Sequence, residues 1–153
     1  MTDFYSTPRQ NYPAPSLRVA ASDGIDDAER TVVLAYRADS KPSVLEQAVK
    51  VARREDAALR AVLFATDSTA GPSTNAIAQT KDLVRGLIEA GVEFEVQRAD
   101  TDVASQILSL AEESGAELIV MSSRRRSPVM KLFLGSSAQR VILEAECPVL
   151  MVK

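Results

Sequence analysis

The sequence contains no histidine and no tryptophan, and its only cysteine is Cys147. The absence of histidine excludes serine–histidine and cysteine–histidine nucleophiles and zinc sites that use imidazole, and it removes the commonest general base. A single cysteine rules out an intramolecular disulfide, which suits a reducing cytoplasm. Because no histidine can stabilise a thiolate at Cys147, we expect this residue to serve packing only.

Long apolar runs and an excess of positive charge are also missing. The net charge is −3, which gives no reason to expect binding to nucleic acid or to an acidic membrane surface. No apolar run approaches the roughly 20 residues that a membrane-spanning helix needs. The segment after Met1 lacks the basic and apolar stretches of a signal peptide. We therefore expect a cytoplasmic protein with neither nucleic acid nor membrane among its partners.

What is present suits one globular domain preceded by a tail. The chain has 153 residues, 46% of them hydrophobic and 25% charged, as in ordinary soluble domains of this size. In residues 1–30, Pro8, Pro13 and Pro15 interrupt any helix and no apolar periodicity occurs. We predict a flexible tail over 1–30 and a single domain over 31–153.

From Thr31 onward, short apolar runs alternate with segments of helical periodicity. Strict alternation of buried strands and amphipathic helices predicts an α/β fold, with a parallel sheet wrapped by helices on both faces. Thr101 or Asp102 is expected to cap the third helix, and Gly91 and Gly115 to end the second and third helices. The strands are predicted over 31–36, 59–67, 92–99, 116–122 and 147–153, and the helices over 43–56, 71–91, 101–115 and 136–146.

The last quarter of the chain carries a family motif. The segment "GAELIVMSSRRRSPVMKLFLGSSAQRVILEAECPVLMVK" joins a strand, a loop ending in Gly-Ser-Ser, a helix and a Cys-Pro-Val strand. In this the region 31–153 resembles the universal stress protein (UspA-like) family. The resemblance implies a Rossmann-like, adenine-nucleotide α-hydrolase-like fold, with an open five-stranded parallel sheet in the order 3-2-1-4-5. It also implies homodimers that pair through their last strands and, in one branch of the family, ATP in the crevice beyond the strand ends.

The resemblance places a nucleotide's phosphates on the loop after the fourth strand. Gly135, Ser136 and Ser137 match the family's closing Gly-Ser motif, and a helix N-terminus there favours an anion. The alternative interpretation makes Ser136 only the N-cap of that helix. The two earlier glycines of the family loop fall on Ser122 and Arg125, so side chains stand where bare backbone would approach the phosphates. Ser123 completes the candidate set on this loop.

The arginines of this loop allow two interpretations. In one interpretation, phosphate is bound directly by basic side chains in place of the lost glycines. These side chains belong to Arg124, Arg125, Arg126 and Lys131. They could equally form a solvated loop with no ligand.

The loop after the first strand also departs from the family pattern. Nucleotide-binding members have an Asp at the end of that strand, whereas here the strand runs into Tyr36 and Arg37, and Asp39 comes later. A local shift would bring Asp39 or Ser40 into the site. Alternatively, Tyr36 or Arg37 fills the pocket, or Asp39 is a loop residue that caps the following helix.

The final strand is predicted to lie on an open edge of the sheet. An apolar edge strand invites pairing with another chain, and a two-fold dimer would hide it in both subunits. A monomer in which the tail or Lys153 blocks the edge is the alternative. The candidate interface consists of Pro148, Val149, Leu150, Met151 and Val152.

Three functions follow from these patterns. The leading hypothesis is a stress-response binding or regulatory protein with a degenerate nucleotide site and weak or absent ATP binding. The alternative is a genuine ATP or AMP sensor in which arginines replace the loop glycines, with ATP and Mg²⁺ as ligands. A slow ATPase is the weakest hypothesis, because no general base, metal-binding carboxylate pair or Walker-type lysine motif is evident, so we predict no enzymatic activity and no resident metal.

Overall fold

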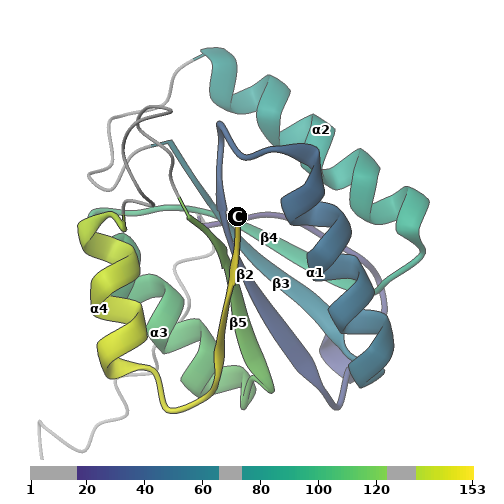
Figure 1. Cartoon of the computed structure of the whole chain (residues 1–153). Coiled ribbons are helices and arrows are strands. Elements are labelled where there is room, and N and C mark those ends of the chain that lie inside the picture. The colour runs from purple at the N-terminus through teal and green to yellow at the C-terminus, as the bar shows by residue number, and fades with distance from the viewer. Residues whose placement is uncertain (1–16, 66–73, 124–133) are drawn as a thin grey trace, which may run out of the picture.

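A computed structural model describes residues 17–65, 74–123 and 134–153. A single twisted sheet forms the middle layer, with α1 and α2 on one face and α3 and α4 on the other (Figure 1). This is the α/β architecture that the alternating apolar runs predict. The helices are α1 (Pro42–Glu55), α2 (Thr74–Ala90), α3 (Val103–Ser114) and α4 (Ser136–Glu144).

The five parallel strands follow the order that the family resemblance implies. Their spatial order is β4-β3-β2-β5-β6, in which β2 is the first parallel strand along the chain and occupies the centre. The direction of winding therefore reverses between β2 and β5. The strands are β2 (Thr31–Arg37), β3 (Ala58–Phe64), β4 (Phe94–Arg98), β5 (Leu118–Ser122) and β6 (Val149–Val152).

A sixth strand corrects the predicted count. The segment β1 (Arg18–Ala21) pairs antiparallel with β4, and a short 3₁₀ helix, η1 (Ile25–Asp27), follows it. The predicted flexible tail is thus wrong for these residues, whereas residues 1–16 lie outside the described part. Strand β1 therefore forms the edge of the sheet next to β4.

Partly buried polar contacts hold β1 in place despite its modest hydrophobicity. Arg18 donates to Glu95 of β4 at 2.6 Å, and Arg60 of β3 donates to the same carboxylate at 2.7 Å. Ile25 is buried, with 1% of its surface exposed. These contacts involve charged residues and one isolated apolar residue, which an apolar-periodicity argument does not detect.

The helix ends follow local chemistry. Asp102 caps α3 by accepting from the Ser105 backbone N–H at 3.1 Å, as predicted for one of two candidates. Gly91 and Gly115 follow α2 and α3 with φ of 72° and 60°, a conformation that suits glycine. Asp56 ends α1 in the same left-handed region, with φ of 52°.

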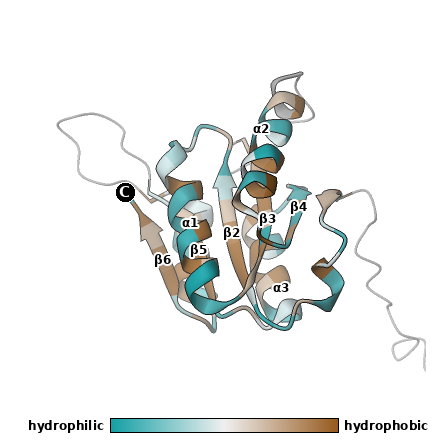
Figure 2. Cartoon of the chain, turned by 90° about the vertical axis from the view of Figure 1, so that its right-hand side faces the viewer, coloured by the Kyte–Doolittle hydropathy of each residue, from teal (hydrophilic) through white to brown (hydrophobic). Residues whose placement is uncertain are grey.

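Two hydrophobic clusters, one on each face, hold the layers together (Figure 2). Leu34, Val44, Leu59 and Leu87 belong to the cluster under α1 and α2. On the other face Val33, Ile107 and Val141 pack beneath α3 and α4. Because successive residues of β2 point to alternate faces, its all-apolar run supplies both clusters.

Candidate functional site

A crevice opens where β2 and β5 end, at the point where the winding direction reverses. Such switch points are where open α/β sheets bind ligands. The crevice lies on the face of the sheet that α3 and α4 cover, because Ala35, Phe64 and Ala138 belong to the core cluster of that face. Its lining consists of Ala35, Arg37, Phe64, Met121, Ser122, Gly135, Ser137 and Ala138.

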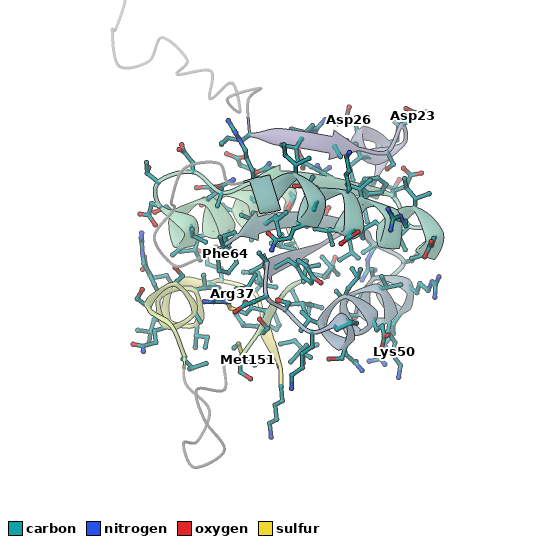
Figure 3. The ribbon with its side chains drawn as sticks, turned by 90° about the horizontal axis from the view of Figure 1, so that it is seen from above. Asp23, Asp26, Arg37, Lys50, Phe64 and Met151 are labelled. Carbon is teal, nitrogen blue, oxygen red and sulfur yellow. The ribbon has the colours of Figure 1, made fainter. Side chains whose placement is uncertain are left out.

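Arg37 occupies this crevice. It is the last residue of β2 and only 8% exposed. Its guanidinium donates from Nε to Asp39 Oδ1 at 2.9 Å and from Nη2 to Asp39 Oδ2 at 3.4 Å. Figure 3 shows Arg37 near the middle of the molecule, close to Phe64 and on the side where α4 lies. A two-point ion pair of this kind fixes the orientation of a guanidinium.

Little space remains around that side chain. The crevice encloses about 20 Å³, which is enough for one water molecule. Pockets that hold a small organic ligand are typically about 300–1,000 Å³. The part of the crevice that the described residues line is therefore smaller than a site for an adenine nucleotide.

The N-terminus of α4 forms one wall of the crevice. Gly135 is the N-cap, with φ of −64°. Because glycine has no side chain, the N–H groups of the first helical turn receive no side-chain cap from this position. Ser136 is the first helical residue and is exposed, so the interpretation of Ser136 as the N-cap is wrong. Ser137 is buried and lines the crevice.

The two serines at the end of β5 have different surroundings. The Ser122 hydroxyl lies 3.5 Å from the Ser40 hydroxyl, so Ser122 joins the loop after β2 to the crevice wall. Ser123 instead donates from its backbone N–H and its hydroxyl to the Val152 carbonyl, at 2.9 Å and 3.3 Å. Ser123 therefore fastens β5 to β6.

The predicted site residues thus divide into two groups. The structure brings Ser122, Gly135 and Ser137 together around Arg37. Ser136 and Ser123 do not line the crevice, and Arg125, with Arg124, Arg126 and Lys131, lies outside the described residues. Asp39 is not part of the crevice lining but pairs with Arg37, and the N-cap of α1 is Lys41 rather than Asp39.

Sequence reasoning missed four lining residues, of which Phe64 is the one aromatic side chain; the others are Ala35, Met121 and Ala138. Phe64 is the last residue of β3, next to Arg37 in the sheet register, and is 5% exposed. Its position at a strand end adjoining the central strand is the signal that could have found it.

The edge strand β6 ends the sheet beside the crevice. It pairs with β5 and is the outermost strand on this side. Leu150 is 39% exposed, and Ile142 and Leu143 of α4 are also exposed. Cys147 precedes this strand half-buried, and burial raises the pKa of its thiol, so its thiolate form is disfavoured.

The described residues hold neither a metal-binding group nor a membrane-spanning helix. Within residues 17–65, 74–123 and 134–153, no three cysteine or carboxylate side chains converge to form a metal-binding group. None of the described helices is long and apolar enough to cross a membrane.

Comparisons with known proteins agree with this architecture. The model of the universal stress protein family matches residues 29–153. A universal stress protein of Mycolicibacterium smegmatis is 34% identical over 125 residues, which cover 80% of this chain and 96% of that protein. The solved universal stress protein of Archaeoglobus fulgidus has 28% identity and a TM-score of 0.64, covering 81% of this chain and 98% of that chain. A structure from the same organism in complex with dAMP has 24% identity and a TM-score of 0.60, with coverage of 81% and 98%.

Proposed function

Since this chain belongs to the universal stress protein family, we propose that it is a cytoplasmic, non-catalytic binding protein of the stress response whose nucleotide crevice is closed by Arg37. The observation that carries the proposal is the crevice volume of about 20 Å³ around a guanidinium held by Asp39. ATP binding is accordingly weak or absent.

The cost of opening the crevice sets the expected affinity. A nucleotide has to displace Arg37 and break its two hydrogen bonds to Asp39. Hydrogen bonds between charged groups contribute about 1.5–3 kcal/mol when protected from solvent. The Asp39 side chain is 61% exposed, so screening reduces this to about 1–2 kcal/mol. Affinity should then fall roughly five- to thirtyfold relative to an open crevice.

A nucleotide sensor is the second candidate, and one observation favours it. Arg37 lines the same crevice as the N-terminus of α4, and both features attract an anion. The fold neighbour from Archaeoglobus fulgidus was solved in complex with dAMP. In this alternative Arg37 swings outward, and together with Arg125 it contacts the phosphates of ATP or AMP, with Mg²⁺ as a counterion.

Calorimetric titration with ATP and AMP, with and without Mg²⁺, separates the two candidates. The Arg37→Ser variant removes the side chain that fills the crevice, and Arg125→Gly restores a glycine of the family loop. A gain in affinity in Arg37→Ser identifies Arg37 as a block, whereas loss of binding identifies it as a ligand. Arg85→Ser is the matched control, because Arg85 is 67% exposed on α2 and its replacement should leave both titrations unchanged.

We propose a homodimer through β6. The backbone N–H groups of Ile119 and Ser123 donate to the carbonyl oxygens of Pro148 and Val152, respectively. The backbone polar groups of the even-numbered residues in this segment therefore point toward β5. In a parallel pair this leaves the N–H and C=O groups of Val149 and Met151 directed at the open edge. Those groups, together with exposed Leu150, support strand pairing with a second copy.

The absence of enzymatic activity is also a proposal. Asp39 is held in an ion pair with Arg37, so its carboxylate is not free to act as a general base. Phosphate release from ATP should therefore stay at background. Release above background that Ser136→Ala abolishes would instead support a slow ATPase.

A further inference from the structure

A second, larger hollow lies on the opposite face of the sheet. It is a groove of about 900 Å³ between α1 and α2, within the volume range of small-molecule pockets. Its apolar walls include Val49 and Leu83, which belong to the core cluster on this face, and Leu45, which packs against that cluster. Figure 2 looks onto this face, with α1 and α2 in front of the sheet. The groove is thus separated from the crevice by the sheet itself.

Two contacts between the helices border this groove. A Cβ added to Gly86 of α2 would lie 2.7 Å from Leu45 Cδ2 of α1, so the helices pack closely at that point. Arg53 of α1 donates to the Ala90 carbonyl of α2 at 2.5 Å. These contacts fix the separation of the walls, so the groove is a preformed feature of the fold.

Tyr36 presents an aromatic ring and a hydroxyl to the groove from the end of β2. Among the described residues, its hydroxyl has no hydrogen-bond partner. An aromatic ring that is half-buried beside a carboxylate offers both a π-face and a polar tip to a ligand.

The rim of the groove carries an excess of negative charge that is open to a ligand. Asp82 and Glu89 stand on the α2 side and Glu46 on the α1 side, against the cations Lys50 and Arg53. The Arg53 guanidinium already donates to a carbonyl. The ion pair of Asp82 with Arg85 has both side chains about 70% exposed (73% and 67%), so it leaves the Asp82 carboxylate largely available. Burial and then the charge of Asp82 raise the pKa of Tyr36, so the field of this carboxylate extends to the aromatic hydroxyl.

We propose that the groove between α1 and α2 is a binding site for a small arylalkylamine, whose ring rests on Leu45, Leu83 and the ring of Tyr36, and whose ammonium group contacts the Asp82 carboxylate and donates to the Tyr36 hydroxyl. The apolar walls favour the ring by burial of its surface. The carboxylate and the face of Tyr36 both favour a cation. An anionic aromatic compound of the same size would face the same walls and be repelled by Asp82, Glu46 and Glu89. The site is independent of the nucleotide crevice and of the proposed function.

Two isosteric probes of opposite charge test this inference on the full chain. Titration of ¹⁵N-labelled protein with 2-phenylethylamine should give saturable amide shifts confined to α1, α2 and the end of β2. For a ligand of this size we expect a Kd on the order of 1 mM or below. The anion 3-phenylpropionate should bind at least about tenfold more weakly at the same ionic strength.

Conservative variants assign the effect to named atoms. Asp82→Asn removes the carboxylate charge and should weaken 2-phenylethylamine binding about fivefold or more while leaving 3-phenylpropionate no weaker. Tyr36→Phe removes only the hydroxyl and should weaken the amine by about two- to fivefold. Glu112→Gln changes charge by the same amount on exposed α3, on the opposite face, and should have no effect. Equal binding of the two probes, equal weakening by Glu112→Gln, or no saturable shifts in α1 and α2 would overturn the proposal.

Discussion

Tyr36 and Arg37 are consecutive residues of β2, yet their side chains line hollows on opposite faces of the sheet. Tyr36 lines the groove between α1 and α2, and Arg37 lines the crevice beside α4. The two-residue period of a strand requires this division. The end of one strand therefore contributes to two separate hollows, and we expect a change at either residue to affect mainly the hollow that it lines.

Glu95 is predicted to be the most important charged residue for stability. Its side chain is 5% exposed and accepts from Arg18 and Arg60. Glu95→Ala leaves the largely buried Arg60 guanidinium without its counter-charge, which should reduce the free energy of unfolding by about 3 kcal/mol. Urea denaturation measures this change. Glu144→Ala, which breaks an exposed pair with Arg140, is the control and should cost less than about 1 kcal/mol. Similar losses in both variants would contradict the role of Glu95.

The lowered pKa of Asp102 predicts that the stability of the fold depends on pH in the acid range. The backbone N–H of Ser105, the Ser105 hydroxyl and Arg140 lower the pKa of Asp102 to about 2. Because this pKa is depressed in the folded state, the stability that ionised Asp102 contributes is present above its ordinary pKa of 3.8 and is lost as the pH falls toward 2.

Unfolding measured between pH 5 and pH 2 in the wild type and in Asp102→Asn tests this linkage. Asparagine still caps a helix but does not titrate. We expect the stability difference between the two proteins to shrink as the pH falls. A constant difference over that range would show that Asp102 titrates normally.

Asp56 and Gly115 provide a matched pair at helix ends. Both have left-handed backbone after α1 and α3, with φ of 52° and 60°, and both donate to carbonyl oxygens of the last turn. A side chain in this conformation costs about 1 kcal/mol. Asp56→Gly should therefore stabilise the protein by up to about 1 kcal/mol, and Gly115→Ala should destabilise it by a similar amount. Thermal unfolding of the two variants should show Tm shifts of opposite sign, and shifts of the same sign would refute the argument.

Leu150 tests the proposed dimer. It lies in the middle of β6 and is 39% exposed, so Leu150→Glu places a charge at the centre of the proposed two-fold interface, opposite its own copy. Sedimentation velocity should report a monomer for this variant. Its far-UV circular dichroism spectrum should match that of the wild type. Ile77→Glu is the control, since Ile77 is 63% exposed on α2 and should leave the dimer intact. A dimer that persists in Leu150→Glu would exclude pairing through β6.

The parallel core of the fold could be predicted because its signals are local. Strands such as β2 are buried on both faces and read as unbroken apolar runs, and helix ends carry their own capping residues. Strand β1 could not be found in this way. Its order comes from Arg18 meeting Glu95, residues far apart in the sequence, and three of its four residues are exposed.

The location of the crevice could be predicted from the sequence, but the side chain that fills it could not. Family spacing brought Ser122, Gly135 and Ser137 to one place, and both Tyr36 and Arg37 were possible occupants. The strand continues one residue further than predicted, through Arg37, and this extra residue decides which of the two side chains enters. The partners of Arg37 come from a local turn and a neighbouring strand end, so only the folded geometry shows its position.

Native mass spectrometry of the purified protein, before and after incubation with ATP, tests the closed crevice most directly. We expect the wild-type protein to carry no adenine nucleotide after purification and to take up little ATP, and Arg37→Ser to take up more under the same conditions. A wild-type protein that retains one adenine nucleotide per chain, and loses it in Arg37→Ser, would contradict the account.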